Sequence, residues 1–219
     1  DDDDDDDDED FGPRKPSETF QHAAASDDDI VEKWRLPIAN EIELISHSRA
    51  VTALALDRSG SRLLTGSYDY TVKFWDFAGM TDALKNFRSI EPEEGHQVRH
   101  IQYSVTGDQF LVITGSARPK IYDRDGKEIC QFLRGDMYLL DKHKTNGHVT
   151  GVTGGCFHPT VKEAILTCST DGTLRLWDIN KVDKRNNNVI KLKAATGQLS
   201  PVTACCYSPS GRIIAGGTQ

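Results

Sequence analysis

The chain has 219 residues, of which 37% are hydrophobic, and its 34 acidic and 26 basic side chains give a net charge of −8. No run of 18 apolar residues occurs, so no membrane-spanning helix is predicted. The N-terminus has neither the basic nor the apolar region of a signal peptide. Residues 1–33 hold fifteen acidic and three basic side chains, so the acidic charge belongs to one end and the remainder, about +4, is mildly basic.

The acidic end of the chain is predicted to be a disordered tail, residues 1–33. Asp1–Asp10 contain nine aspartates and one glutamate, and such a run repels itself and offers no apolar mass to bury. The tail is either a solvated, solubilising segment or an acidic arm for basic partners such as histones and RNA-binding proteins. Ser26 precedes three aspartates and is a predicted phosphorylation site, where a phosphate would add further negative charge. Order is expected to begin near Trp34.

The first apolar segments after the tail read as strands. Residues 41–45 alternate polar and apolar side chains, as a half-buried strand does. Val51–Leu56 is apolar or β-branched nearly throughout, so we expect both of its faces to be covered. A turn ending at Gly60 follows, and further strands are predicted at Leu63–Ser67 and Val72–Phe77.

This unit recurs along the chain, which indicates a repeat architecture. Three segments align, running from His47 to Asp76, from His96 to Asp123 and from His148 to Asp178. The aspartates at their ends are separated by 47 and 55 residues. A fourth segment begins at Ser200, and an outer strand at Lys127–Leu133 follows an Asp-Gly hairpin turn in the second unit.

The pattern of a His near the start of each unit and Trp-Asp at its end resembles the WD-repeat family. The resemblance covers residues from about Ile42 to Gln219. It implies an all-β propeller, with about three and a half blades of a seven-bladed ring, and hence a piece of a longer protein. The domain expectation is a tail at 1–33 and a partial propeller at 34–219. Its blades are expected at about 46–90, 95–135, 147–193 and 200–219.

In that family, each blade ties its inner strands with a polar relay of His, turn Asp, Ser/Thr and Trp. The resemblance therefore implies structural roles for eight residues: His47, Thr65, Asp69 and Trp75 in the first unit, and His148, Thr167, Asp171 and Trp177 in the third. The second unit departs from the pattern, since Tyr122 replaces Trp and Arg118 aligns with Asp69. This departure is either ordinary repeat degeneracy or an exposed turn, with Arg118 and Lys120, that binds an acidic partner.

No catalytic or cofactor-binding motif is present: GxGxxG, GxxxxGK and GxSxG are all missing from the sequence. His96 and His100 form the one HxxxH pair, without a central Glu, and His96 is already assigned to the repeat. The five cysteines show no zinc-like spacing and suit a reducing compartment, where they pack as small apolar residues. We expect no enzyme activity, metal or cofactor; an enzyme would require convergent carboxylates or metal-binding histidines in the channel.

The basic loops at Lys142–Lys144 and Lys181–Arg185 are short and lack interleaved aromatic residues, so direct contact with nucleic acid is expected to be weak. The resemblance extends to the nuclear WD-repeat proteins related to the gastrulation-defective protein, through IYDRDGKEICQFLRGD among other stretches. It implies a nuclear scaffold holding proteins of a larger assembly, in chromatin and DNA-damage signalling linked to histone ubiquitination or in the spliceosome. A direct RNA- or chromatin-binding module is the alternative. The expected contacts are the turn of the second unit, with Arg118, and the connections at 79–94, 136–146 and 180–199.

Overall fold

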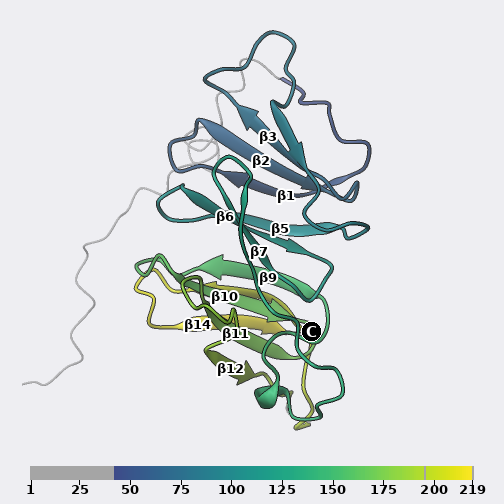
Figure 1. The fold of residues 1–219 in the computed structure, drawn as a ribbon, viewed down its shortest axis with the longest axis vertical. Helices are drawn as coiled ribbons and strands as arrows, with labels where there is room; N and C mark the ends of the chain where they lie inside the picture. Colours follow the sequence, from purple (N-terminus) through teal and green to yellow (C-terminus); the bar gives the residue numbers. More distant parts are fainter. Residues whose placement is uncertain (1–41, 195, 219) are drawn as a thin grey trace, which may run out of the picture. The chain divides into compact units, whose positions relative to one another are not determined.

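A computed structural model describes residues 42–194 and 196–218 of the chain. The predicted tail at 1–33, Ser26 and Trp34 lie outside the described residues. Leu44–Gln219 form one compact unit of successive antiparallel β-sheets (Figure 1). The short 3₁₀ helix η1 (Lys142–Lys144) is the one helix in the described part of the chain, and no helix there is long and apolar enough to cross a membrane.

Three of the sheets have four strands in chain order, and the fourth has two. The first sheet contains β1 (Val51–Leu56), β2 (Arg62–Ser67), β3 (Val72–Asp76) and β4 (Arg88–Ile90). The second contains β5 (Val98–Tyr103), β6 (Gln109–Thr114), β7 (Lys120–Asp123) and β8 (Glu128–Gln131). The third contains β9 (Val152–Phe157), β10 (Ala164–Ser169), β11 (Thr173–Asp178) and β12 (Asn188–Lys191). The fourth contains β13 (Val202–Tyr207) and β14 (Ile214–Thr218). The predicted fold class, propeller blades built from antiparallel strands, is confirmed.

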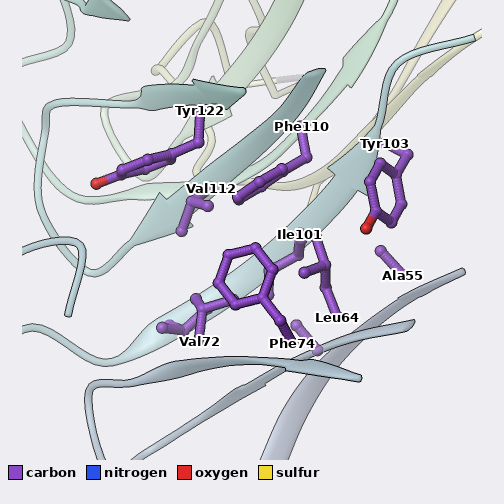
Figure 2. Packing of buried hydrophobic residues seen from close by; sticks show 11 residues of the cluster. Ala55, Leu64, Val72, Phe74, Ile101, Tyr103, Phe110, Val112 and Tyr122 are labelled. Carbon is purple, nitrogen blue, oxygen red and sulfur yellow. The ribbon is translucent and has the colours of Figure 1, made fainter. Parts of the chain in front are cut away.

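The core lies between successive sheets, because a single sheet cannot bury both of its faces alone. Figure 2 shows the side chains packed between the first two sheets. Phe74 from β3 meets the ring of Phe110 from β6 edge-on, with 5.6 Å between the ring centroids. Phe110 in turn stacks on Tyr122 from β7 at 5.5 Å. Such aromatic pairs contribute about 0.5–1.5 kcal/mol each beyond the burial of their area.

Neighbouring sheets are also joined by hydrogen bonds from equivalent threonines. The hydroxyl of Thr52 on β1 donates to the carbonyl oxygen of Val98 on β5 at 2.5 Å. The hydroxyl of Thr153 on β9 donates in the same way to Val202 on β13 at 2.7 Å. These bonds repeat at the same strand position, so they fix the first strand of one sheet against the first strand of the next.

Two predictions for the start of the propeller are wrong. Both faces of β1 were expected to be covered, but Leu54 is 66% exposed and Leu56 is 56% exposed. Ala53 and Ala55 are buried against the second sheet, whereas no sheet in the described part of the chain packs on the other face. Residues 42–45 form no strand, because no described strand pairs with their backbone.

Candidate interaction surface

The four relay residues of the first sheet come from the segment before β1, from β2, from the β2–β3 turn and from β3. Nδ1 of His47 lies 2.8 Å from the Asp69 carboxylate, and Nε2 lies 2.7 Å from the Thr65 hydroxyl. The indole nitrogen of Trp75 donates to the same Thr65 oxygen at 3.0 Å. Because the Asp69 carboxylate can only accept, Nδ1 of His47 carries the proton and donates to it. Nε2 then accepts from the Thr65 hydroxyl, whose oxygen accepts the Trp75 N–H.

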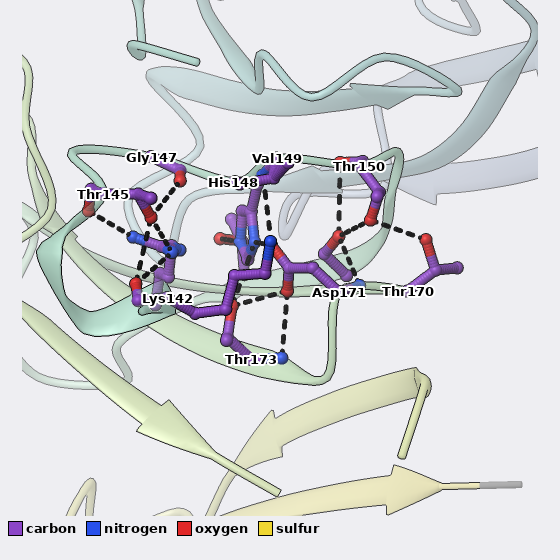
Figure 3. Close-up of polar contacts among 12 residues, drawn as sticks. Lys142, Thr145, Gly147, His148, Val149, Thr150, Thr170, Asp171 and Thr173 are labelled. Carbon is purple, nitrogen blue, oxygen red and sulfur yellow. Dashed lines mark hydrogen bonds and ion pairs between the residues drawn. The ribbon is translucent and has the colours of Figure 1, made fainter. Parts of the chain in front are cut away.

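The third sheet repeats this relay, and Figure 3 shows its His148 and Asp171 among their polar partners. Nδ1 of His148 lies 3.2 Å from Asp171 Oδ2, and Nε2 lies 2.7 Å from the Thr167 hydroxyl. Trp177 donates to Thr167 at 2.7 Å. The Asp171 carboxylate also accepts hydrogen bonds from the backbone N–H groups of Val149 and Thr173 at 3.1 and 3.0 Å, so one side chain closes two turns.

Burial and hydrogen bonding fix the charge states of this relay. Burial lowers the pKa of His148 below its ordinary value and outweighs the opposing influence of Asp171, so the ring is neutral. Burial acts to raise the pKa of Asp171, but hydrogen bonds from His148 and Thr173 prevail and lower it to about 2. In the first sheet, hydrogen bonds from Thr71 and His47 likewise outweigh burial and lower the pKa of Asp69.

A His, an Asp and a hydroxyl within hydrogen-bond reach resemble a hydrolase triad, but this set is closed to solvent. A nucleophile must be reachable by substrate, yet Thr167 and His148 are 0% exposed. Every polar atom of the set is engaged within its own sheet. Removing one partner would leave buried polar groups unpaired, at a cost of about 1–3 kcal/mol for each group.

The second sheet does not form the relay, and the strand register corrects the alignment made from sequence. Val98 pairs with Thr114 as Val51 pairs with Ser67, so Ser116 stands at the position of Asp69. The hydroxyl of Ser116 accepts the backbone N–H of Arg118 at 3.1 Å, just as Asp69 accepts that of Thr71 at 3.0 Å. Arg118 therefore replaces a threonine and not the turn aspartate.

The other relay positions of the second sheet are apolar or displaced. By the same register, Val112 stands where Thr65 stands in the first sheet, so the acceptor hydroxyl is missing there. His96 forms no bond to a turn carboxylate; its Nδ1 lies 3.0 Å from the Glu94 carbonyl oxygen. The assignment of His96 to the repeat is therefore wrong, because the connection before β5 places Glu94, and not His96, at the position of His47.

An open cavity of about 460 Å³ lies beside this incomplete relay, between the turns of the second and third sheets. It is lined by Glu93, His96, Arg118 and Arg134 together with Thr150. Arg118 and Arg134 are exposed, and the structure shows neither of them in an ion pair with a described residue. Guanidinium groups match carboxylate and phosphate geometry, so the cavity presents two arginines suited to an acidic group.

Lys120, which was expected to share the exposed turn with Arg118, lies elsewhere. It is the first residue of β7, its side chain is 14% exposed, and Nζ donates to Glu128 at 3.0 Å. Arg134, which sequence reasoning missed, takes its place at the cavity. No local pattern marks Arg134, because it lies 16 residues beyond Arg118 and reaches the same cavity only through the fold.

No described group of three or more His, Cys, Asp or Glu side chains is arranged to hold a metal ion. His96 precedes β5 and His100 lies within it, and burial lowers the pKa of His100. All five cysteines are free thiols, and of the adjacent pair Cys205 is half-buried while Cys206 is exposed.

Repeated antiparallel blades, each closed in the first and third cases by a His–Asp–Thr–Trp relay, define a WD-repeat propeller. The model of the "WD domain, G-beta repeat" matches residues 40–76 and 140–178, the two stretches that contain the complete relays. The chain belongs to the WD-repeat family.

Several curated relatives are similar to most of the chain. WD repeat-containing protein 70 of Xenopus laevis is 45% identical over 184 residues, which is 84% of this chain and 29% of that protein. The human protein of that name is 44% identical over 185 residues, 84% of this chain and 28% of the relative. The Gastrulation defective protein 1 homolog of Drosophila melanogaster is 45% identical over 183 residues, with the same coverage. The chain thus spans about three tenths of the length of these relatives.

Proposed function

We propose that the chain acts as a non-catalytic adaptor that holds proteins together within a nuclear complex. The observation that carries the proposal is a difference between two sets of polar residues. The relay residues of the first and third sheets bond to one another and are largely buried, whereas Arg118 and Arg134 line an open cavity and form no ion pair with a described residue. Polar groups of the first kind stabilise the blades, and those of the second kind are available to a partner.

The proposed complex works either in chromatin and DNA-damage signalling linked to histone ubiquitination or in spliceosomal ribonucleoprotein assembly. Similarity to WD repeat-containing protein 70 and to the Gastrulation defective protein 1 homolog supports a shared cellular role with those relatives. Mild positive charge over residues 42–219, with 22 basic and 18 acidic side chains, suits acidic protein partners. The proposal places the protein in the nucleus.

Proximity labelling with the full-length protein tests this proposal. The wild type is compared with an Arg118→Glu, Arg134→Glu double variant and with a matched Arg58→Glu, Arg212→Glu control, whose arginines lie away from the cavity. We expect labelled nuclear proteins from one of the two complexes, a subset of which the cavity variant loses and the control keeps. A cytoplasmic distribution, or the same labelled set for all three proteins, contradicts the proposal.

A further inference from the structure

The connection between the second and third blades is a loop whose two ends touch. The backbone N–H of Gly135 donates to the carbonyl oxygen of His148 at 2.8 Å. A Cβ atom on Gly135 would lie 2.1 Å from the carbonyl oxygen of Gly147, and one on Gly147 would lie 1.8 Å from that of Leu133. Both glycines are therefore required by close backbone contact, and residues 135–147 form a compact loop of the Ω type. We call this segment the Ω-loop.

The tip of the Ω-loop exposes four consecutive large apolar side chains, Met137, Tyr138, Leu139 and Leu140. Tyr138 is 87% exposed and Leu140 is 98% exposed, so these side chains do not hold the loop in place. Val182, on the next loop along the surface, is 95% exposed. A run of adjacent large apolar residues kept in water marks an interaction site.

The Ω-loop is instead held by a buried arginine, Arg175. Arg175 projects from β11, is 0% exposed, and donates to the carbonyl oxygens of Lys142 and Thr145 at 3.0 and 2.9 Å. It also donates to the Thr145 hydroxyl at 2.6 Å and to Asn186 at 2.9 Å. Lys191 on β12 adds an ion pair to Asp141 at 2.7 Å. Because polar groups beneath it fix the backbone, the apolar tip is presented in a defined conformation and less freedom is lost on binding.

Positive charge lies directly beside the apolar tip. Lys142, His143 and Lys144 form η1, and neither lysine pairs with a described carboxylate. Two hydrogen bonds join this region to the neighbouring loop, from Leu133 N to Lys184 O at 3.2 Å and from Asn186 N to Asn146 O at 3.2 Å. Asp141, at the end of the apolar run, pairs with Lys191, so the unpaired charges beyond it are those of Lys142 and Lys144. The surface is therefore an apolar strip with basic residues at one end and Asp136 at the other. Its complement is a segment with apolar side chains and acidic ones that face the two lysines.

We propose that the Ω-loop is a docking site for a segment of a partner protein that presents apolar side chains flanked by aspartates or glutamates. This inference rests on the proposed adaptor function and adds a particular contact to it. A protein segment fits the patch better than a nucleic acid does, because a single aromatic side chain offers little stacking surface. Anionic membrane binding is the other reading of basic and apolar residues together, and the test separates it.

The first experiment is photo-crosslinking in cells with the full-length protein. The photoreactive residue p-benzoylphenylalanine replaces Tyr138 in one protein and Val161, 46% exposed on the β9–β10 turn, in the control. Mass spectrometry of the crosslinked peptide is expected to find a protein segment of the stated composition at position 138 and not at position 161. Crosslinks to lipid, to RNA or to the chain's own acidic residues 1–10, or none at position 138, overturn the inference.

The second experiment titrates that segment, made as a fluorescein-labelled peptide, against the full-length protein. Leu140→Ser is expected to raise the dissociation constant at least tenfold. The double variant Lys142→Glu, Lys144→Glu should also raise the dissociation constant and should make binding less dependent on salt. Val161→Ser should stay within twofold, and all three variants should keep the wild-type melting temperature because the replaced side chains do not support the blades. Equal affinities for Leu140→Ser and Val161→Ser overturn the inference. If binding at the Ω-loop is lost while the proximity labelling that depends on Arg118 and Arg134 is kept, the proposed adaptor function still stands.

Discussion

Ser116 occupies in the second blade the turn position that Asp171 occupies in the third. Each accepts the backbone N–H two residues ahead, at 3.1 Å from Arg118 N to Ser116 Oγ and at 3.0 Å from Thr173 N to Asp171 Oδ1. The hydroxyl can close the turn, but it cannot also bind a histidine and a second backbone N–H as the carboxylate does. The second blade therefore keeps the shape of the turn without the relay.

This difference predicts unequal roles for two histidines. His148→Ala is expected to lower the free energy of unfolding by about 2–4 kcal/mol, because Thr167 and Asp171 each lose one buried hydrogen-bond partner and a cavity opens beside Trp177. His96→Ala should change it by less than about 0.5 kcal/mol, since His96 lies at an open cavity. Urea unfolding of both variants measures the two values, and similar losses would show that the second blade has a relay after all.

The same buried pair predicts how stability depends on pH. The folded-state pKa of His148 lies below its ordinary value and that of Asp171 is about 2, so the unfolded chain binds more protons than the folded one as the pH falls. Stability should be highest above about pH 6.5 and decline first through His148, and then through Asp171 between about pH 4 and 2. Melting temperatures from pH 8 to 3 test this, and a shallower decline between pH 7 and 5 is expected for His148→Gln. A melting temperature that rises on acidification from pH 7 to 5 is the opposite result.

Close packing at the base of the Ω-loop predicts a strong effect from one methyl group. Gly147→Ala would place a Cβ 1.8 Å from the Leu133 carbonyl oxygen and is expected to cost about 2 kcal/mol or more. Amide exchange at Gly135, whose N–H bonds to His148, should accelerate as the loop opens. Gly79→Ala is the control, because the nearest atom would lie at an ordinary 3.5 Å. An unchanged exchange rate at Gly135 in the Gly147 variant would refute the description of the loop base.

The threonine bonds between sheets predict a smaller, local effect. Thr153→Val keeps the shape of the side chain and removes its hydrogen bond to Val202, at an expected cost of about 1 kcal/mol. Amide hydrogen exchange should rise in β13 more than in β6, because β13 loses its hydrogen bond to β9. Thr203→Val is the matched control, since Thr203 is exposed and bonds within its own sheet. A uniform rise over both strands would mean that the bond does not hold one sheet to the next.

Much of the fold could be predicted because each blade carries local signals. Apolar runs such as Val51–Leu56 are bounded by glycine turns, and the spacing of His, Asp and Trp recurs in the first and third units. The alignment of the second unit fails when His96 is taken as its start, because the connection before β5 places Glu94 at the position of His47. Counting back six residues from Tyr122, as from Trp75 to Asp69, leads to Ser116.

The candidate sites were harder to predict, since they depend on how distant segments meet. Arg118 and Arg134 share a cavity although they come from different connections. Arg175 stands in an alternating strand, where its charge suggests an outward side chain, yet it is fully buried under the Ω-loop. Lys73 occupies the same strand position in the first sheet and donates to the Ser46 hydroxyl at 2.9 Å. In both blades, a basic side chain at this position therefore binds the segment before the first strand.

The measurement that tests the central claim most directly is the unfolding free energy of Asp171→Ala, taken together with partner binding by the same sample. We expect the variant to lose about 3 kcal/mol or more of unfolding free energy, because a buried carboxylate that binds a histidine and two backbone N–H groups is removed. Asp183→Ala, in an exposed loop, is the control and should match the wild type. Binding should then fall only as far as the folded fraction falls. A variant that is as stable as the wild type but has lost partner binding would contradict this account and place Asp171 in a functional site.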